Sequence, residues 1–215
     1  MITTLSPRTH TGVTATLPGG ATVVLRPLGR AETGPQLAVL EGMSSASRFQ
    51  RFLTAIPARV SAAILTMMSG VDGHRHIAWW ASVDGHPAAV ARCIQVGSGL
   101  ADIAIEVADA HQWRGIGSVL LDAVLTVGDT HGVRRLIAVV HPGNRACVRM
   151  LGHVGLRLRL VDGLLEGESD CGCPTRRAST ERRCSPPPHA RPSSGAAWTT
   201  ARRLGSPSLV STADT

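Results

Sequence analysis

Apolar and polar residues alternate, or recur with helical spacing, along most of the chain up to residue 168. We expect strands at 22–28, 76–83, 88–96, 102–107, 135–140, 156–161 and 164–165. We expect helices over 30–53, with a polar break at 44–45, over 61–68, from Ile116 to about Gly132, and over 144–154. This order of elements predicts an α/β (α+β) domain in which helices flank a mixed, mostly antiparallel central sheet.

The pattern is clearest between residues 102 and 132. Asp102 and Glu106 share one face of the expected strand 102–107, and branched apolar residues share the other face. In the helix that follows, apolar residues recur at spacings of three and four. They are Ile116, Val119, Leu120, Ala123, Val124 and Val127. This spacing places them on one side of the helix, which indicates packing against the sheet.

The apolar pattern ends after Glu168. Ser, Thr, Pro, Gly and Arg dominate from there to Thr215, and three consecutive prolines occupy 186–188. We therefore expect a flexible N-terminus over 1–20, a folded domain over 21–168 and a disordered tail over 169–215. A shifted reading frame in GC-rich DNA would also produce such a tail, and the sequence leaves that alternative open.

The net charge of +7 is concentrated in this tail. Residues 171–215 carry 7 Arg and 2 acidic residues, whereas residues 1–170 carry 15 Arg and 13 acidic residues. The expected domain is therefore nearly balanced in charge, and no nucleic-acid partner is expected. No apolar run is long enough for a transmembrane helix, no signal peptide is recognisable, and the five cysteines lack disulfide-framework spacing. We expect a cytoplasmic protein with no membrane partner.

The segment 112–117, Gln-Trp-Arg-Gly-Ile-Gly, joins the expected strand at 102–107 to the helix that begins at Ile116. A glycine turn before a helix N-terminus favours a bound anion, because glycine lets the backbone approach the ligand and the free N–H groups and helix dipole attract negative charge. A P-loop would need Lys-Ser/Thr after its second glycine, and the chain has no lysine. A Rossmann fingerprint would need a third glycine and a place near the start of a domain. The expected ligand carries a pyrophosphate or a similar anion.

The pattern Q-x-x-G-x-G at 112–117 resembles the acetyl-CoA signature of the GCN5-related N-acetyltransferase (GNAT) family. The order of elements over 21–168 is similar to that of the family, and Asn144 followed by Gly155-Leu156 resembles its N-(x)10-G-F element. Segments 47–52 and 101–109 resemble a subgroup that includes bacterial protein-lysine acetyltransferase domains. The resemblance implies a GNAT fold and metal-free transfer of an acetyl group from acetyl-CoA by direct attack of an acceptor amine. The acceptor would be a protein lysine or a small amine, and a homodimer is left open.

The resemblance also implies which residues hold coenzyme A. The loop and the first helical turn would bind the pyrophosphate through backbone N–H groups, and the end of the strand at 102–107 would hydrogen-bond the pantetheine. The expected binding residues are Val107, Gln112, Trp113, Arg114, Gly115, Ile116, Gly117, Ser118 and Asn144. An ordinary strand-to-helix turn that needs glycines is the alternative for this loop.

Acetyl transfer to an amine needs a general base, because an ammonium ion has no lone pair. Asp102 is the favoured catalytic candidate, since the subgroup carries a glutamate ten residues before the loop glutamine. Glu106 is the rival, and both carboxylates are also compatible with a solvated surface or with pairing to arginines. On an ideal strand they lie roughly 13 Å apart, too far for a close pair. Many family members place a tyrosine that can protonate the departing thiolate at the position of Leu151, and this chain has no tyrosine.

The missing tyrosine keeps a second interpretation open, namely a non-catalytic acyl-CoA-binding regulatory domain. A third is an interaction protein that acts through its basic tail. No histidine or cysteine group has convincing metal-ligand spacing, so no metal is expected. Arg48 and Arg51 are expected on a solvated helix face, although they also suit the steering of an acidic acceptor. Trp79 and Trp80 are expected on opposite faces of one strand.

Overall fold

The computed structural model describes residues 12–57, 65, 68 and 70–169. Within this part of the chain the strands form one eight-stranded sheet in the order β1-β2-β3-β4-β5-β6-β8-β7. The strands are β1 (Val13–Thr16), β2 (Thr22–Pro27), β3 (His76–Val83), β4 (His86–Gly97), β5 (Leu100–Val107), β6 (Arg135–Val140), β7 (Leu156–Val161) and β8 (Leu164–Ser169). Every neighbouring pair is antiparallel except β5 and β6. The predicted fold class, a mixed and mostly antiparallel sheet flanked by helices, is confirmed.

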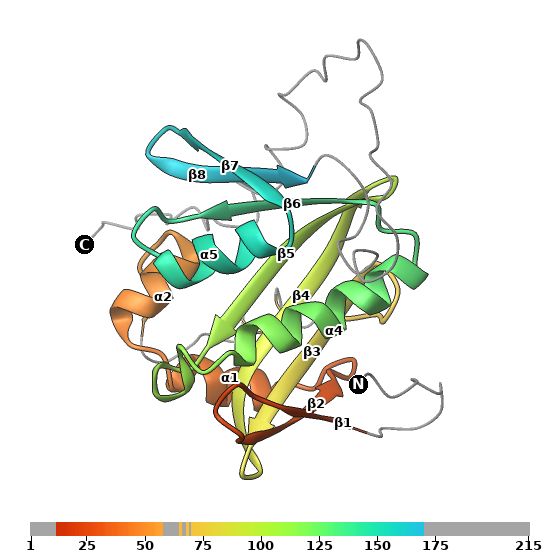
Figure 1. Ribbon diagram of the computed structural model, residues 1–215, viewed down its shortest axis with the longest axis vertical. Helices are drawn as coiled ribbons and strands as arrows, with labels where there is room; N and C mark the ends of the chain where they lie inside the picture. The colour runs from red at the N-terminus through yellow and green to blue at the C-terminus, as the bar shows by residue number, and fades with distance from the viewer. Residues whose placement is uncertain (1–11, 58–64, 66–67, 69, 170–215) are drawn as a thin grey trace, which may run out of the picture.

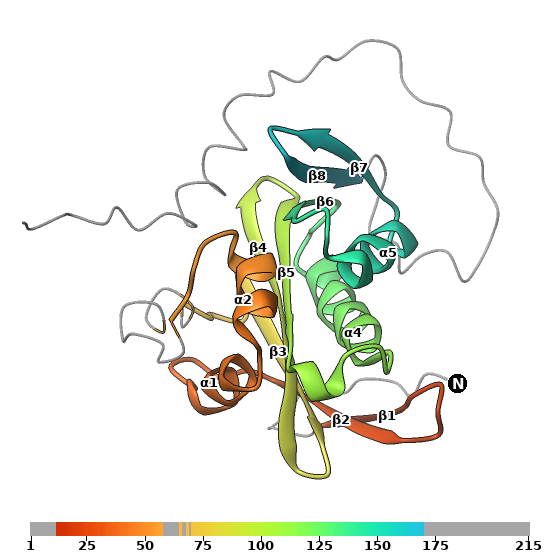
Figure 2. The ribbon, with the colours of Figure 1, turned by 90° about the vertical axis from the view of Figure 1, so that its left-hand side faces the viewer.

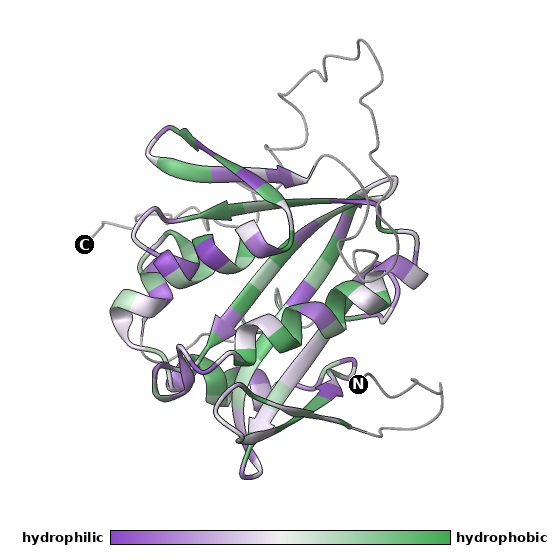
Figure 3. Ribbon diagram, viewed as in Figure 1, coloured by the Kyte–Doolittle hydropathy of each residue, from purple (hydrophilic) through white to green (hydrophobic). Residues whose placement is uncertain are grey.

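Helices cover both faces of this sheet. They are α1 (Gly34–Glu41), α2 (Ser45–Phe52), α4 (Ile116–Thr130) and α5 (Arg145–His153), with a 3₁₀ turn, η1, at Asp109–His111. Figure 2 shows α1 and α2 on one side of the sheet and α4 and α5 on the other. A large apolar core includes Trp79 and the buried side of α4, and a smaller one lies around α1, where Trp80 packs. The two tryptophans therefore face opposite sides of β3, as predicted. Figure 3 shows apolar residues along much of α4 and the central strands.

Three parts of the chain differ from the expected element boundaries. The helical region expected over 30–53 begins only at Gly34 and forms two helices, which are separated near the expected polar break at 44–45. Ser44 caps the second helix, α2, because its side chain accepts a hydrogen bond from Ser47 N over 3.2 Å. Residues 13–16, expected to be flexible, form β1 and pair in register with β2. The last strand runs on to Ser169, whose buried Oγ accepts from Leu136 N over 2.8 Å. That bond stabilises the end of β8 beyond the boundary expected from apolar periodicity.

Two predictions fall mainly on residues outside the described part of the chain. Of the helix expected over 61–68, only Leu65 and Met68 are described, and both are helical. Of the tail expected over 169–215, only Ser169 is described.

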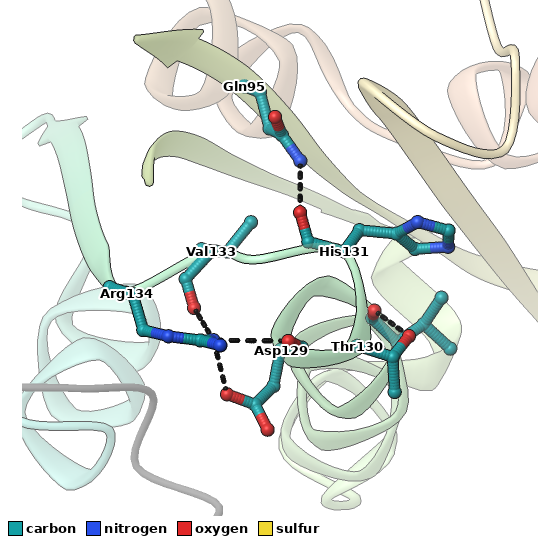
Figure 4. A network of polar contacts seen from close by, with 7 residues as sticks. Gln95, Asp129, Thr130, His131, Val133 and Arg134 are labelled. Atoms are coloured by element: carbon teal, nitrogen blue, oxygen red, sulfur yellow. Dashed lines mark hydrogen bonds and ion pairs between the residues drawn. The ribbon is translucent and has the colours of Figure 1, made fainter. Parts of the chain in front are cut away.

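The C-terminal end of α4 is anchored by the network drawn in Figure 4. Arg134 Nη1 donates to Asp129 Oδ1 over 2.7 Å and to the carbonyl oxygens of Asp129 and Val133 over 3.1 and 2.9 Å. Gln95 Nε2, on β4, donates to His131 O over 3.1 Å. Two of these contacts give side-chain donors to carbonyl groups at the helix end, those of Asp129 and of the C-cap residue His131. They fix α4 across the sheet, so that its opposite end meets the end of β5.

Candidate functional site

The sheet opens between β5 and β6. The two strands pair in parallel only from Leu100 to Asp102, opposite Arg135 to Ile137, after which β6 pairs with β8 instead. In Figure 1, β6 runs away from β5 beyond this point. Ala108 N donates a hydrogen bond to Ala88 O, which lies next to β4. Because only alternate residues of an antiparallel strand bond to their partner, Ile105 and Val107 direct their N–H and C=O groups away from β4, toward the opening. The edge of β5 at Ile105 and Val107 therefore offers N–H and C=O groups to a ligand.

A cavity of about 310 Å³ occupies this opening and extends to the start of α4. Its walls come from α2, β5, the glycine loop, the first turn of α4, and α5. Eight of the nine predicted coenzyme-binding residues line it. They are Val107, Gln112, Trp113, Gly115, Ile116, Gly117, Ser118 and Asn144. The ninth, Arg114, is not among the lining residues: its Nη1 lies 3.2 Å from His111 Nδ1 on the exposed surface.

The first turn of α4 is built to accept an anion. Gly115 stands before the helix at φ +87°, a left-handed conformation that favours glycine, and no side chain caps the helix start. The N–H groups of Ile116, Gly117 and Ser118 consequently have no partner within the helix. A Cβ on Gly117 would lie 3.4 Å from Met150 Sδ and 3.6 Å from Val107 Cγ2, inside the cavity wall. The absence of a side chain there lets a ligand approach the helix backbone.

Gln112 ties the glycine loop to its surroundings. Its Nε2 lies 3.3 Å from Val107 O, 3.0 Å from Asp109 Oδ1 and 3.3 Å from Ser47 Oγ. Asp109 Oδ2 in turn accepts from Ser44 N over 3.2 Å. These bonds join β5, η1 and the start of α2. The amide side chain therefore orders the loop and one wall of the cavity together.

Glu106 is clamped between two arginines. Arg51 Nε donates to its Oε1 over 2.7 Å, and Arg92 Nη1 donates to its Oε2. Burial by itself raises the pKa of Glu106, but Arg92 and Arg51 outweigh it and hold the pKa below its usual value. Glu106 is 1% exposed and lines neither this main cavity nor a second, smaller cavity between β5, β6 and α5. A carboxylate with both oxygens engaged and a lowered pKa is a weak base.

Asp102 has the opposite environment. It is half-buried at the point where the β5–β6 pairing ends, and burial raises the pKa of its carboxyl group to about 6, against smaller opposing effects of Arg51 and the Ile103 backbone N–H. A carboxylate of this pKa is ionised at neutral pH yet more basic than an ordinary aspartate. Asp102 itself lines neither cavity, whereas the next residue, Ile103, lines the smaller one.

The face of α2 turned to the opening contributes polar side chains to the site, among them an arginine expected in solvent. Ser47, Gln50 and Arg51 line the main cavity. Arg48 is buried and its Nη1 lies 3.4 Å from Pro57 O, while Arg51 is 25% exposed. The expectation that both arginines face solvent is therefore wrong. Their i, i+3 spacing places both arginines on one helix face but does not show whether that face is buried.

A smaller cavity of about 30 Å³ lies deeper in the opening, between β5, β6 and α5. Arg51, Cys147 and Leu151 are among its lining residues. Burial raises the pKa of the Cys147 thiol to about 11, against a smaller opposing effect of Arg51. Leu151 is 2% exposed and forms an apolar wall. Asn144, which lines both cavities, caps α5 by accepting from Cys147 N over 3.1 Å.

Two further properties concern only the described part of the chain. No group of three His, Cys, Asp or Glu side chains there is arranged to hold a metal ion. None of the helices there combines the length and apolar character required to cross a bilayer.

The chain is similar to known acetyltransferases over the region that builds this site. Residues 48–156 match the sequence profile of the Acetyltransferase (GNAT) family. A curated acetyltransferase of Pseudomonas aeruginosa is 30% identical over 151 residues, which cover 66% of this chain and 80% of that protein. The solved GNAT domain of S. lividans PAT is 26% identical with a TM-score of 0.68, and the match covers 76% of this chain and 98% of that domain.

A putative acetyltransferase from Salmonella typhimurium, solved with its cofactor acetyl-CoA, shares the fold. It is 14% identical with a TM-score of 0.52, and the match covers 74% of this chain and 98% of that one.

Proposed function

The chain belongs to the GNAT acetyltransferase family, and we propose that it moves an acetyl group from acetyl-CoA to the side-chain amine of a protein lysine by direct attack. The observation that carries this proposal is the opening between β5 and β6, where a free strand edge, an uncapped helix start and a cavity of about 310 Å³ meet. A thioester supplies an activated acetyl group. The residues of this chain bind it, orient it and remove a proton from the amine.

Coenzyme A fits the groups that the opening presents. The N–H groups of Ile116, Gly117 and Ser118 suit the pyrophosphate, because they are unpaired within the helix and lie at the positive end of its dipole. The backbone of Ile105 and Val107 suits the amides of the pantetheine in the manner of an added strand. Asn144 holds the start of α5 against the cavity. No metal takes part in this mechanism.

Asp102 is the proposed general base, and Glu106 positions charge rather than taking a proton. The choice rests on their opposite environments: the pKa of Asp102 is raised to about 6, while two arginines hold the pKa of Glu106 below its usual value. The proposed pantetheine site begins at Ile105, which lies three residues, or about 10 Å, from Asp102 along the strand. This distance is too long for direct proton transfer. Proton transfer from an amine at the thioester therefore passes through water.

Direct attack is favoured over an acyl-enzyme intermediate. In the described part of the chain, Cys147 is the one cysteine that lines either cavity, and with a pKa of about 11 its thiol is protonated at neutral pH. The thiolate is the reactive form of cysteine. Protein lysine is favoured as acceptor by the resemblance of segment 47–52 to protein-lysine acetyltransferase domains and by the similarity to the GNAT domain of S. lividans PAT.

The test is thiol release from acetyl-CoA by the full chain, assayed against lysine-containing proteins and a panel of small amines, with coenzyme A binding measured by calorimetry. Asp102→Asn is expected to lower kcat by about 100-fold or more while the coenzyme still binds. Asp162→Asn, the same substitution in the exposed turn between β7 and β8 where asparagine adopts the same backbone conformation, is the matched control and should keep full activity. Coenzyme binding without transfer to any amine would replace this proposal with a non-catalytic acyl-CoA-binding domain.

A further inference from the structure

The departing sulfur of coenzyme A needs a partner at the base of the opening. When an amine attacks a thioester, the electron pair of the C–S bond goes to sulfur, which becomes a thiolate unless a proton reaches it. The chain has no tyrosine and no lysine. Cys147 is no proton donor for this step, because its pKa of about 11 lies above the value of about 8.5 for an ordinary cysteine thiol. Leu151, on the same wall, is apolar.

Arg51 is the cation that reaches this place. In the part of the chain that the structure describes, it is the one positively charged side chain that lines both the main cavity and the smaller cavity beneath it. The smaller cavity also contains Cys147 and Leu151 in its walls, so the guanidinium approaches the region from the α2 side while α5 closes it from the other. A sulfur placed at this depth would meet a fixed positive charge.

The guanidinium is held in place from behind. Its Nε bonds to Glu106, a fully buried carboxylate that Arg92 engages from β4. Two arginines and one glutamate leave this cluster with a net positive charge. Within the described residues, Nη1 and Nη2 of Arg51 make no hydrogen bond, so these donors remain available to a ligand, and Cζ lies 4.8 Å from the centroid of the Phe52 ring. Their positive charge already acts on a neighbouring sulfur, because Arg51 lowers the pKa of Cys147 against the effect of burial.

We propose that Arg51 stabilises the coenzyme A thiolate as it leaves, so that the C–S bond breaks without a protein proton donor. In this step the amine nitrogen forms the N–C bond, the C–S electron pair passes to sulfur, and the amine proton leaves toward Asp102 through water. The thiolate pairs with Arg51 and takes a proton from solvent on release. Glu106 and Arg92 are positioning residues, since they act only through Arg51. This inference rests on the proposed function.

The experiment titrates the thiol of coenzyme A bound to the full chain, by the ultraviolet absorbance of the thiolate, with desulfo-coenzyme A as the blank for protein thiols. An opposite charge within about 4–6 Å lowers a pKa by about 1–3 units, so the bound thiol should titrate that far below free coenzyme A. Arg51→Gln should return the pKa to at least the free value, and Arg51→Lys, which keeps the charge, should retain part of the decrease. Arg159→Gln, on the exposed face of β7, is the matched control and should equal the wild type.

Each outcome separates this inference from the proposed function. A bound thiol whose pKa in the wild-type protein equals that of free coenzyme A overturns the role of Arg51, whether or not Arg51→Gln folds. The same holds if Arg51→Gln folds and leaves the pKa lowered. Failure of coenzyme A to bind the wild type would instead overturn the proposed function, and this inference with it.

Discussion

Arg51 Nε lies 2.7 Å from Glu106 Oε1, and this ion pair joins the last turn of α2 to the C-terminal half of β5. The other oxygen of Glu106 engages Arg92 on β4. The pair connects residues 55 positions apart and fixes a cation beside the opening between β5 and β6. The position of Arg51 therefore depends on a carboxylate that does not itself line the cavity.

Glu106→Gln is expected to destabilise the fold strongly. The substitution leaves Arg92, which is 2% exposed, without a counter-charge, and removing one partner of a buried ion pair costs about 3–5 kcal/mol. Urea unfolding should show this loss in the free energy of unfolding. Glu168→Gln, which breaks an exposed pair with Arg135, is the matched control and should cost less than about 1 kcal/mol. Equal losses in the two variants would contradict a buried, stabilising clamp on Glu106.

Much of the fold could be predicted from local pattern. Strands at His76–Val83, Arg135–Val140 and Leu156–Val161 were predicted with the boundaries that the structure has, because each is an apolar run closed by turn residues. Asp84-Gly85 forms the hairpin turn between β3 and β4, with positive φ at both residues. The glycine loop could also be found, because its chemistry depends on residues that follow one another in the chain.

The base of the opening could not be predicted in this way. Whether β5 keeps its partner depends on where β6 turns toward β8, and that is a property of pairing between distant segments. Arg51 and Cys147 come together only because α2 and α5 lie on opposite sides of the same gap. The sequence leaves open that Glu106 pairs with an arginine, but it does not say that Arg51 and Arg92 are the partners or that the pair is buried.

The rate of acetyl transfer should depend on the ionisation of Asp102. Because the carboxylate is the basic form, kcat/KM is expected to rise with pH up to about 6, the pKa of Asp102, and then to level off. A further rise at high pH would come from the acceptor, since lysine has a pKa of about 10.4. The measurement is a pH profile of the wild type and of Asp102→Asn. The assignment of the base would be wrong if both profiles showed the same inflection near pH 6.

Asp102→Asn should also make the folded protein more stable above pH 6. Burial raises the pKa of Asp102 from 3.8 to about 6, so the folded state binds the proton more tightly than the unfolded state. Wild-type stability therefore falls as pH rises through this window, whereas asparagine does not titrate. Urea unfolding at several pH values should show a gain for Asp102→Asn that is largest above pH 6 and shrinks toward pH 4. A gain that did not change with pH would exclude desolvation of the carboxylate as its cause.

Gly117→Leu is expected to weaken coenzyme A binding more than about tenfold without unfolding the protein. The Cβ position of Gly117 lies 3.4 Å from Met150 Sδ in the wall of the main cavity, so a larger side chain would fill the space before the helix start. Gly117→Ala makes only ordinary contacts there and should bind better than the leucine variant. Gly152→Leu, at an exposed α5 position with no atom near its Cβ, is the control and should bind normally. Calorimetry with coenzyme A measures the difference, and unchanged affinity in Gly117→Leu would place the coenzyme elsewhere.

Cys147→Ala should retain acetyl transfer at a rate within about tenfold of the wild type. The pKa of about 11 keeps the Cys147 thiol protonated at neutral pH, so it is neither a nucleophile for the thioester nor a necessary proton donor. Losing Sγ leaves a small space beside Leu151, which is expected to alter positioning only modestly. Rapid mixing of acetyl-CoA with excess enzyme, followed by mass spectrometry of the quenched protein, should find no acetyl group on Cys147. A burst of acetylated Cys147 that formed before product, together with loss of transfer in Cys147→Ala, would replace direct attack with a two-step mechanism through an acyl-enzyme.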